Sequence, residues 1–280
     1  GVQPSAVVRF AKHFGLSGFS EMQRLFREGL AEQIAPGRAY ELRVRDMVEA
    51  GPAALEPVQI ADEFLKGGVP EKSSILLLGP PKSGKTTFGI QFLFEGLKNN
   101  EYGVCILTND FPEEFVRQFE RFGNLNPILQ NGLLRFVDCY SMHVGISKSN
   151  TVFIIRVNGP TALSEISIAM SEILRVLPAS SVKRIVIDSI STLLLYNSPS
   201  LVLELVQILS GKAKNSNSNI VFLVEEGTHK ETDITTLSSM TDGIFHMKEI
   251  NNQNLFEIKG FGLQNVQLNY TFEEGRLKSS

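Results

Sequence analysis

The sequence of 280 residues has little that points to a membrane, an oxidising compartment or a metal centre. No apolar run approaches the roughly 18 residues that a membrane-spanning helix needs. The two cysteines, Cys105 and Cys139, stand in apolar stretches, which predicts buried thiols in a reducing cytoplasm rather than a disulfide framework. None of the four histidines has the spacing of a metal-binding pair; they are His13, His143, His229 and His246.

The chain also lacks an excess of charge of one sign. It has 27 Lys and Arg against 30 Asp and Glu, a net charge of −3, which gives no whole-chain argument for nucleic acid or a membrane surface as partner. Its 42% hydrophobic and 20% charged residues are typical of a globular protein large enough for one domain plus an appendage. The chain begins at Gly1, without Met or a signal-peptide pattern, so we expect its start to be internal to a longer protein or trimmed.

The pattern of apolar residues divides the chain into three parts. Residues 1–50 predict a short all-α segment, and residues 51–60, "GPAALEPVQI", predict a linker. From residue 61 to residue 280, apolar β-rich runs alternate with helical stretches, which is typical of an α/β domain with a mainly parallel central sheet. The final part, about 242–273, predicts short strands that extend one sheet edge in antiparallel fashion.

Within the α/β part, the sequence predicts individual elements. The expected strands are 74–78, 103–108, 133–138, 184–188 and 219–224. The expected helices are 85–98, 112–122, 161–177 and 199–214.

The stretch "GPPKSGKTT" at residues 79–87 follows a strand-like apolar run and precedes a helix, and it fits the phosphate-binding pattern G-x-x-x-x-G-K-[ST]. Gly79 and Gly84 allow the loop to curl so that backbone N–H groups face phosphate oxygens, and the helix N-terminus adds positive charge. Lys85 then contacts the β- and γ-phosphates, and Thr86 offers its hydroxyl to Mg²⁺. The predicted nucleotide-binding residues are Gly79, Pro80, Pro81, Lys82, Ser83, Gly84, Lys85, Thr86 and Thr87.

A second metal ligand is expected at the end of another strand. In "RIVIDSIST", Asp188 follows a buried apolar run, and ligands of open α/β sheets bind at the carboxyl ends of the strands. We favour a metal role for Asp188 together with Thr86; the alternative is a carboxylate that caps the next turn.

Three stretches together, "FLKGGVPEKSSILLLGPPKSGKTTFGIQFLFEGL", "GLLRFVDCYS" and "RIVIDSIST", resemble the KaiC-like branch of the RecA-superfamily ATPases over about residues 61–280. The resemblance implies a RecA-like P-loop core, ATP and Mg²⁺ as cofactors, and a homo-oligomeric ring or filament with the nucleotide at the subunit interface.

The resemblance fails where a catalytic base is expected. KaiC-like proteins usually carry two glutamates after the second strand, but "LTNDFPEE" places Asn109 and Asp110 there. An amide cannot accept a proton at neutral pH, whereas Asp110 can, with a shorter side chain. Asp110 is therefore a catalytic candidate, beside Lys85, with turn capping as the alternative.

A second departure lies near the C-terminus. In this family a lysine, a spacer and an arginine commonly reach the neighbouring subunit's γ-phosphate. Here "EIKGFG" keeps Lys259 as a candidate that acts in trans but has Phe261 at the arginine position. Glu225 and Glu226, after another strand, are further acidic groups at the ligand edge, with ordinary loop charges as the more favoured interpretation.

The first helices, "GVQPSAVVRFAKHFGLSGFSEMQRLFREGL", resemble the DNA-binding domain of RpiR-type bacterial regulators from the recognition helix onward. The resemblance implies that four polar residues face DNA, namely Gln3, Ser5, Arg9 and Lys12. The preceding helices of that domain are absent, and residues 1–50 are balanced in charge, so the alternative is packing on the ATPase part or on a partner.

These observations predict a cytoplasmic ATP- and Mg²⁺-binding protein that hydrolyses ATP slowly and acts in regulation or nucleotide-dependent assembly, with a protein or DNA as a further partner. Two alternatives remain open: a nucleotide sensor that does not hydrolyse ATP, and a transcriptional regulator that binds DNA through its N-terminal helices.

Overall fold

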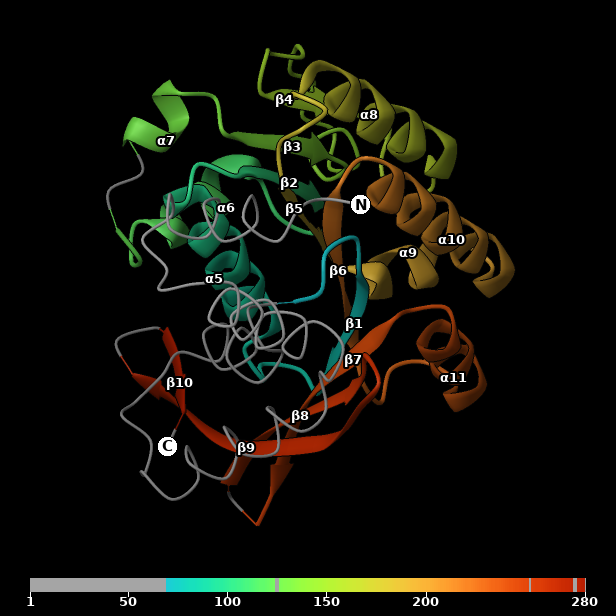
Figure 1. Cartoon of the computed structure of the whole chain (residues 1–280). Helices are drawn as coiled ribbons and strands as arrows, with labels where there is room; N and C mark the ends of the chain where they lie inside the picture. The colour runs from blue at the N-terminus through green and yellow to red at the C-terminus, as the bar shows by residue number, and fades with distance from the viewer. Residues whose placement is uncertain (1–68, 124–125, 252, 274–275, 280) are drawn as a thin grey trace, which may run out of the picture. The chain divides into compact units, whose positions relative to one another are not determined.

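A sheet of ten strands runs through the part of the chain that the structure, a computed structural model, describes: residues 69–123, 126–251, 253–273 and 276–279 (Figure 1). The predicted helical segment 1–50, the linker 51–60 and the four candidate DNA-facing residues lie outside these residues.

The strands cross the sheet in the order β10-β9-β8-β7-β1-β6-β5-β2-β3-β4. Neighbours from β7 to β4 are parallel, and β7 to β10 are joined by antiparallel pairs. The bounds are β1 Ser74–Gly79, β2 Tyr102–Leu107, β3 Leu134–Asp138, β4 Ile154–Arg156, β5 Lys183–Asp188, β6 Ser218–Glu225, β7 Gly243–Ile250, β8 Gln253–Gly260, β9 Leu263–Glu273 and β10 Arg276–Ser279.

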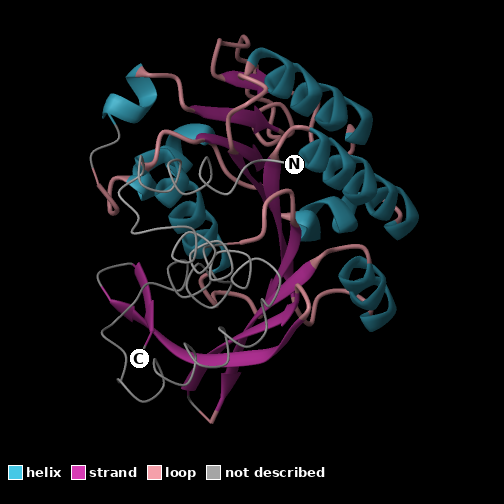
Figure 2. Ribbon diagram, viewed as in Figure 1, coloured by secondary structure: helices cyan, strands magenta, loops and turns pink. Residues whose placement is uncertain are grey.

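Helices cover both faces of the sheet (Figure 2). On one face lie α5, α6 and α7, and on the other lie α8, α9, α10 and α11 (Figure 1). The bounds are α5 Lys85–Lys98, α6 Pro112–Phe119, α7 Asn126–Gln130, α8 Leu163–Val176, α9 Ile190–Tyr196, α10 Pro199–Asn215 and α11 Glu231–Ser239.

The sequence of strand β1 is apolar without alternation because both faces of the strand are buried. Ile75 and Leu77 belong to the core under α5, whereas Leu76 and Leu78 belong to the core under α10. A strand that is buried on both faces reads as a continuous apolar run. Because β1 lies between β7 and β6, its end, where the phosphate loop starts, lies at the carboxyl edge of the sheet between two other strands.

The C-terminal strands close over the face that carries α5. The Phe88 ring of α5 stacks on Phe256 of β8 with centroids 5.4 Å apart, and it meets Phe245 of β7 edge-on at 5.7 Å. The Gln91 side chain exchanges two hydrogen bonds of 3.2 Å with the backbone of Leu277 in β10. The helix that follows the phosphate loop is therefore held from both the central sheet and the extension.

The α/β fold, the mainly parallel sheet and the antiparallel C-terminal extension are confirmed. The first strand of the extension, β7, is itself parallel to β1, and the antiparallel part begins at β8. The sequence does not predict the short elements β4, α7, α9, α11 and β10, and it predicts a second helix to 122, whereas α6 ends at Phe119.

Candidate functional site

The segment between β1 and α5 is a tight loop at the carboxyl edge of the parallel sheet. The N–H of Ser83 donates to the carbonyl of Pro80 at 3.2 Å, and Gly84 takes a φ of 94° at the N-cap of α5. A Cβ on Gly79 would lie 2.5 Å from the Ser83 Oγ, so the loop curls back over its own first residue. The two pattern glycines are therefore required by close approach and by backbone conformation, as the sequence predicts.

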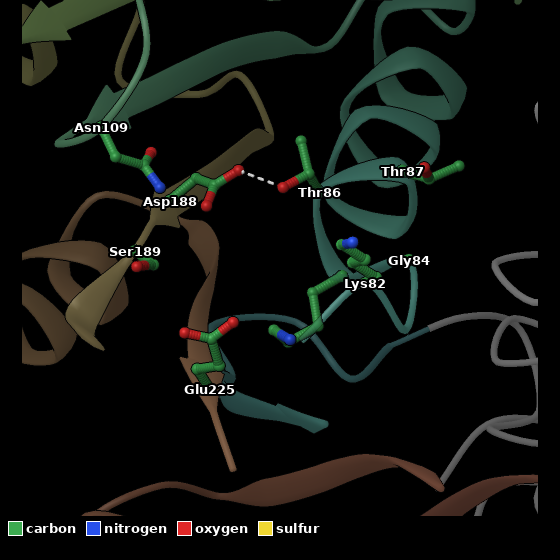
Figure 3. A pocket seen from close by; sticks show the side chains of 9 residues that line it. Lys82, Gly84, Thr86, Thr87, Asn109, Asp188, Ser189 and Glu225 are labelled. Carbon is green, nitrogen blue, oxygen red and sulfur yellow. Dashed lines mark hydrogen bonds between the residues drawn. The ribbon is translucent and has the colours of Figure 1, made fainter. Parts of the chain in front are cut away.

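A pocket of about 330 Å³ opens beside this loop (Figure 3). Its walls come from the loop and the start of α5, from the segment that follows β2, from the end of β5 and from the end of β6. The lining residues are Lys82, Gly84, Lys85, Thr86, Thr87, Asn109, Asp188, Ser189 and Glu225.

Thr86 and Asp188, the predicted metal ligands, lie together in this pocket. The Thr86 Oγ1 donates to the Asp188 Oδ2 at 2.7 Å, as the dashed line in Figure 3 shows. Burial raises the pKa of Asp188 to about 6, against the hydrogen bond from Thr86 and the charge of Lys85. The start of α9 is capped by Ser189, whose Oγ accepts the N–H of Thr192. Ser189 thus caps α9, and the Asp188 carboxylate contacts Thr86; the metal role of the pair stays a prediction.

Lys85 lies at the first position of α5 and turns back toward the loop. Its ammonium donates to the carbonyls of Gly79 at 2.9 Å and Pro80 at 2.7 Å. Burial lowers its pKa, and the nearby carboxylates of Glu225 and Asp188 oppose that shift. A lysine ammonium has three donors, so one remains beyond those that the two loop carbonyls accept.

Of Asn109 and Asp110, which follow β2 and Thr108, only Asn109 lines the pocket. Asp110 is not among the lining residues: its carboxylate accepts the N–H of Phe111 at 2.8 Å and the amide of Gln118 at 3.3 Å. Burial raises the pKa of Asp110. These contacts favour the turn-capping interpretation of Asp110, and its catalytic role stays a prediction.

The two glutamates at the end of β6, Glu225 and Glu226, have different surroundings. Glu225 lines the pocket because the register of β1 with β6 sets it opposite Gly79. Glu226 instead contacts the His246 Nε2 at 2.8 Å. The sequence favours ordinary loop charges for both residues and offers no means to distinguish them.

Lys259 and Phe261 lie at and just beyond the end of β8. The Lys259 ammonium pairs with the Glu257 Oε2 at 3.1 Å. The Phe261 ring packs over Gly243 and against Phe245, with ring centroids 6.2 Å apart. The proposed action of Lys259 on a neighbouring subunit stays a prediction.

Tyr270 is a supporting residue that the sequence did not indicate. Its hydroxyl donates to the carbonyl of Ser83 at 3.1 Å, and it is buried. It belongs to β9, far along the chain, and only the closure of the C-terminal strands brings it to the loop.

The described residues contain no helix long and apolar enough to cross a membrane. Nor do they gather three or more His, Cys, Asp or Glu side chains into a metal-binding cluster.

A P-loop at the carboxyl edge of a mainly parallel sheet, faced by an acidic residue at the end of β5, two strands from β1, defines a P-loop nucleotide-binding protein, and its family match makes it a RecA-like one. The family model of the KaiC ATPases matches residues 57–261, and the chain belongs to that family.

The chain is also similar to curated relatives. The chain is 34% identical over 155 residues to a UPF0273 protein of Pyrococcus horikoshii, a match that covers 54% of this chain and 60% of the relative. It is 31% identical over 155 residues to a UPF0273 protein of Thermotoga maritima, covering 54% and 62% of the two chains. The match thus spans about three fifths of the length of these relatives.

Proposed function

We propose that this chain binds ATP together with Mg²⁺ in the P-loop pocket and hydrolyses it slowly. The observation that carries the proposal is the 2.7 Å contact of Thr86 with Asp188 directly beside Lys85. A hydroxyl, a carboxylate and an ammonium at the curled loop are the groups that a magnesium–triphosphate needs.

The residues present fit both the phosphate chain and the metal. Gly84 at a φ of 94° lets the loop turn its backbone N–H groups toward the pocket, where the N-terminus of α5 adds partial positive charge. Thr86 and Asp188 would hold the magnesium ion, which supplies neutralising charge when bound. Lys85 would direct its remaining donor at the phosphates.

Slow turnover follows from the side chain at position 109. Asn109 lines the pocket next to the metal-binding pair, and its amide cannot take a proton from water. Asp110 is held by Phe111 and Gln118 outside the lining. The pocket's own carboxylates are Asp188, which faces Thr86, and Glu225, which attracts Lys85.

A role in regulation or nucleotide-dependent assembly suits slow hydrolysis, because bound nucleotide then stabilises one state for a long time. Following the family resemblance, we propose a cytoplasmic homo-oligomer with the nucleotide at the subunit interface and a protein or DNA as further partner. Asn109 also favours a second candidate, a nucleotide sensor that does not hydrolyse ATP at all. The DNA-binding alternative depends on Gln3, Ser5, Arg9 and Lys12, which lie outside the described residues.

One set of measurements tests binding, turnover and assembly together. Light scattering and phosphate release are recorded for the purified chain with ATP, with ADP and without nucleotide, and nucleotide affinity is measured with and without Mg²⁺. Lys85→Ala should lose nucleotide binding, whereas Lys98→Ala, at the other end of α5, should retain it. Absence of nucleotide binding by the unchanged chain would refute the proposal. Rapid phosphate release that Lys85→Ala abolishes would refute slow turnover alone.

A further inference from the structure

We propose that Lys82 supplies a second phosphate-binding cation within the same chain, and that it makes the site prefer a nucleoside triphosphate to a diphosphate. This inference rests on the proposed function, because it concerns the ligand of the same pocket.

The first argument is the position and backbone of Lys82. It lines the pocket within the loop, with a φ of 64°, in the left-handed region that favours glycine. The structure shows no hydrogen bond or ion pair for its ammonium within the described ranges, and the side chain is exposed. A lysine in an unfavourable conformation, without a partner among the residues that the structure describes, lies where a phosphate chain would supply one.

The second argument is the charge of the pocket. Four lining residues are charged: Lys82 and Lys85 are cations, and Asp188 and Glu225 are anions. Their formal charges sum to zero, and without Lys82 the other three sum to one net negative charge. A magnesium–nucleoside triphosphate is itself an anion, so Lys85 alone would leave the ligand facing a pocket of like sign.

The third argument is the lack of another cation. Among the described residues, the pocket lining contains no arginine and no lysine besides Lys82 and Lys85. Lys85 already donates to two loop carbonyls, and Lys259 is paired with Glu257. Lys85 thus has one donor left for the phosphates, whereas in the described part of the chain all three donors of Lys82 remain, so we expect Lys82 to add charge at the outermost phosphate and its effect to be larger for ATP than for ADP.

The test is an equilibrium titration of fluorescent ATP and ADP analogues, with Mg²⁺, at several salt concentrations. Lys82→Gln should weaken ATP binding about tenfold or more, as loss of a charge-assisted hydrogen bond predicts, and ADP binding by a smaller factor. It should also flatten the salt dependence of ATP binding. Lys82→Arg, which keeps the charge, should remain within about threefold of the unchanged chain.

Lys72→Gln is the matched control. Lys72 is also an exposed lysine at a positive φ, 60°, but it precedes β1 at the opposite end of the strand from the loop. It should bind both nucleotides as the unchanged chain does. Lys82→Gly should melt at a higher temperature, because it relieves the backbone conformation, and yet bind ATP as weakly as Lys82→Gln.

The outcomes separate the two proposals. If Lys82→Gln binds ATP as Lys72→Gln does, the inference about Lys82 is overturned, whereas loss of binding in Lys85→Ala still supports the proposed function. Equal weakening for ATP and ADP would overturn the preference for the triphosphate. If the unchanged chain binds neither nucleotide, both proposals are overturned together.

Discussion

Thr86 and Asp188 are 102 positions apart in the sequence, and their side chains meet in a hydrogen bond of 2.7 Å. Thr86 comes from the first turn of α5 and Asp188 from the end of β5. The contact forms because β1 and β5 both pair with β6 and end at the same edge of the sheet. The fold thus places a hydroxyl and a buried carboxylate side by side where the loop can present phosphate oxygens to a shared cation.

This buried carboxylate should lower the stability of the metal-free protein. Burial raises the pKa of Asp188 from 3.8 to about 6, so at pH 7 the folded state holds a charge that the unfolded state accommodates more easily. Asp188→Asn should therefore raise the free energy of unfolding without Mg²⁺ by about 1–3 kcal/mol, since one pKa unit corresponds to about 1.4 kcal/mol. Urea denaturation in a chelator measures the gain, and the same variant should no longer bind nucleotide more tightly when Mg²⁺ is added.

Asp138 at the end of β3 provides the contrast. It is also fully buried, but its carboxylate accepts hydrogen bonds from the N–H groups of Tyr140 and Ser141 and pairs with Arg156. Asp138→Asn should destabilise the protein because it breaks these charge-assisted contacts. If Asp188→Asn lowers the free energy of unfolding as Asp138→Asn does, Asp188 has a structural role and is not a preformed metal ligand.

Restoring a carboxylate at position 109 should speed up hydrolysis. Asn109 already lines the pocket, so Asn109→Glu places a proton acceptor near the metal-binding pair without moving the loop. General bases contribute about 10²–10⁴-fold, and for an imperfectly placed one we expect at least a tenfold rise in phosphate release. Asp110→Asn is the control and should leave the rate nearly unchanged, because Phe111 and Gln118 hold that carboxylate. Loss of all turnover in Asp110→Asn would instead identify Asp110 as the base.

Glu257 in β8 should make the free energy of unfolding depend on pH in the acidic range. Burial by itself raises the pKa of Glu257, but hydrogen bonds from Lys248, Lys259 and Gln267 outweigh it and lower the pKa from 4.5 to about 2. A lowered carboxylate pKa stabilises the fold above about pH 4.5, and this contribution is lost as the pH falls toward 2. Glu257→Gln should therefore cost about 2 kcal/mol at pH 7, a value reduced for the partly exposed lysines. In urea denaturation, the difference from the unchanged chain should shrink to less than half near pH 3; a difference that does not vary with pH would contradict this.

The phosphate loop and the central strands could be predicted because local rules determine them. Gly79 and Gly84 at fixed spacing between an apolar strand and a helix specify the loop, and Asp188 follows from the end of a buried strand. The strand Ile154–Arg156 could not be predicted, because three residues are too few to show a period. Its pairing with β3 is a tertiary contact.

The finer features of the site depend on register and packing. Nothing in the pair Glu225 and Glu226 tells which one faces the pocket until β6 is aligned with β1. Tyr270 reaches Ser83 only because β9, in the C-terminal extension, contributes Tyr270 to the same core as α5. The sequence likewise shows that Phe261 replaces an expected arginine but not where the ring goes.

The structure gives that ring a packing role that can be measured. Phe261 covers Gly243 so closely that a Cβ there would lie 2.0 Å from its Cε2. Gly243→Ala should therefore lower the free energy of unfolding by about 1–3 kcal/mol through overpacking. At Gly211 in helix α10 an added Cβ would meet no atom within 4 Å, so Gly211→Ala should be tolerated or raise stability. In the Phe261→Ala background, Gly243→Ala should cost at least about 1 kcal/mol less, since neighbouring residues couple. Urea denaturation of the four chains of this cycle gives the coupling directly. Strictly additive effects would mean that the ring does not rest on Gly243 in solution and is free to contact a neighbouring subunit.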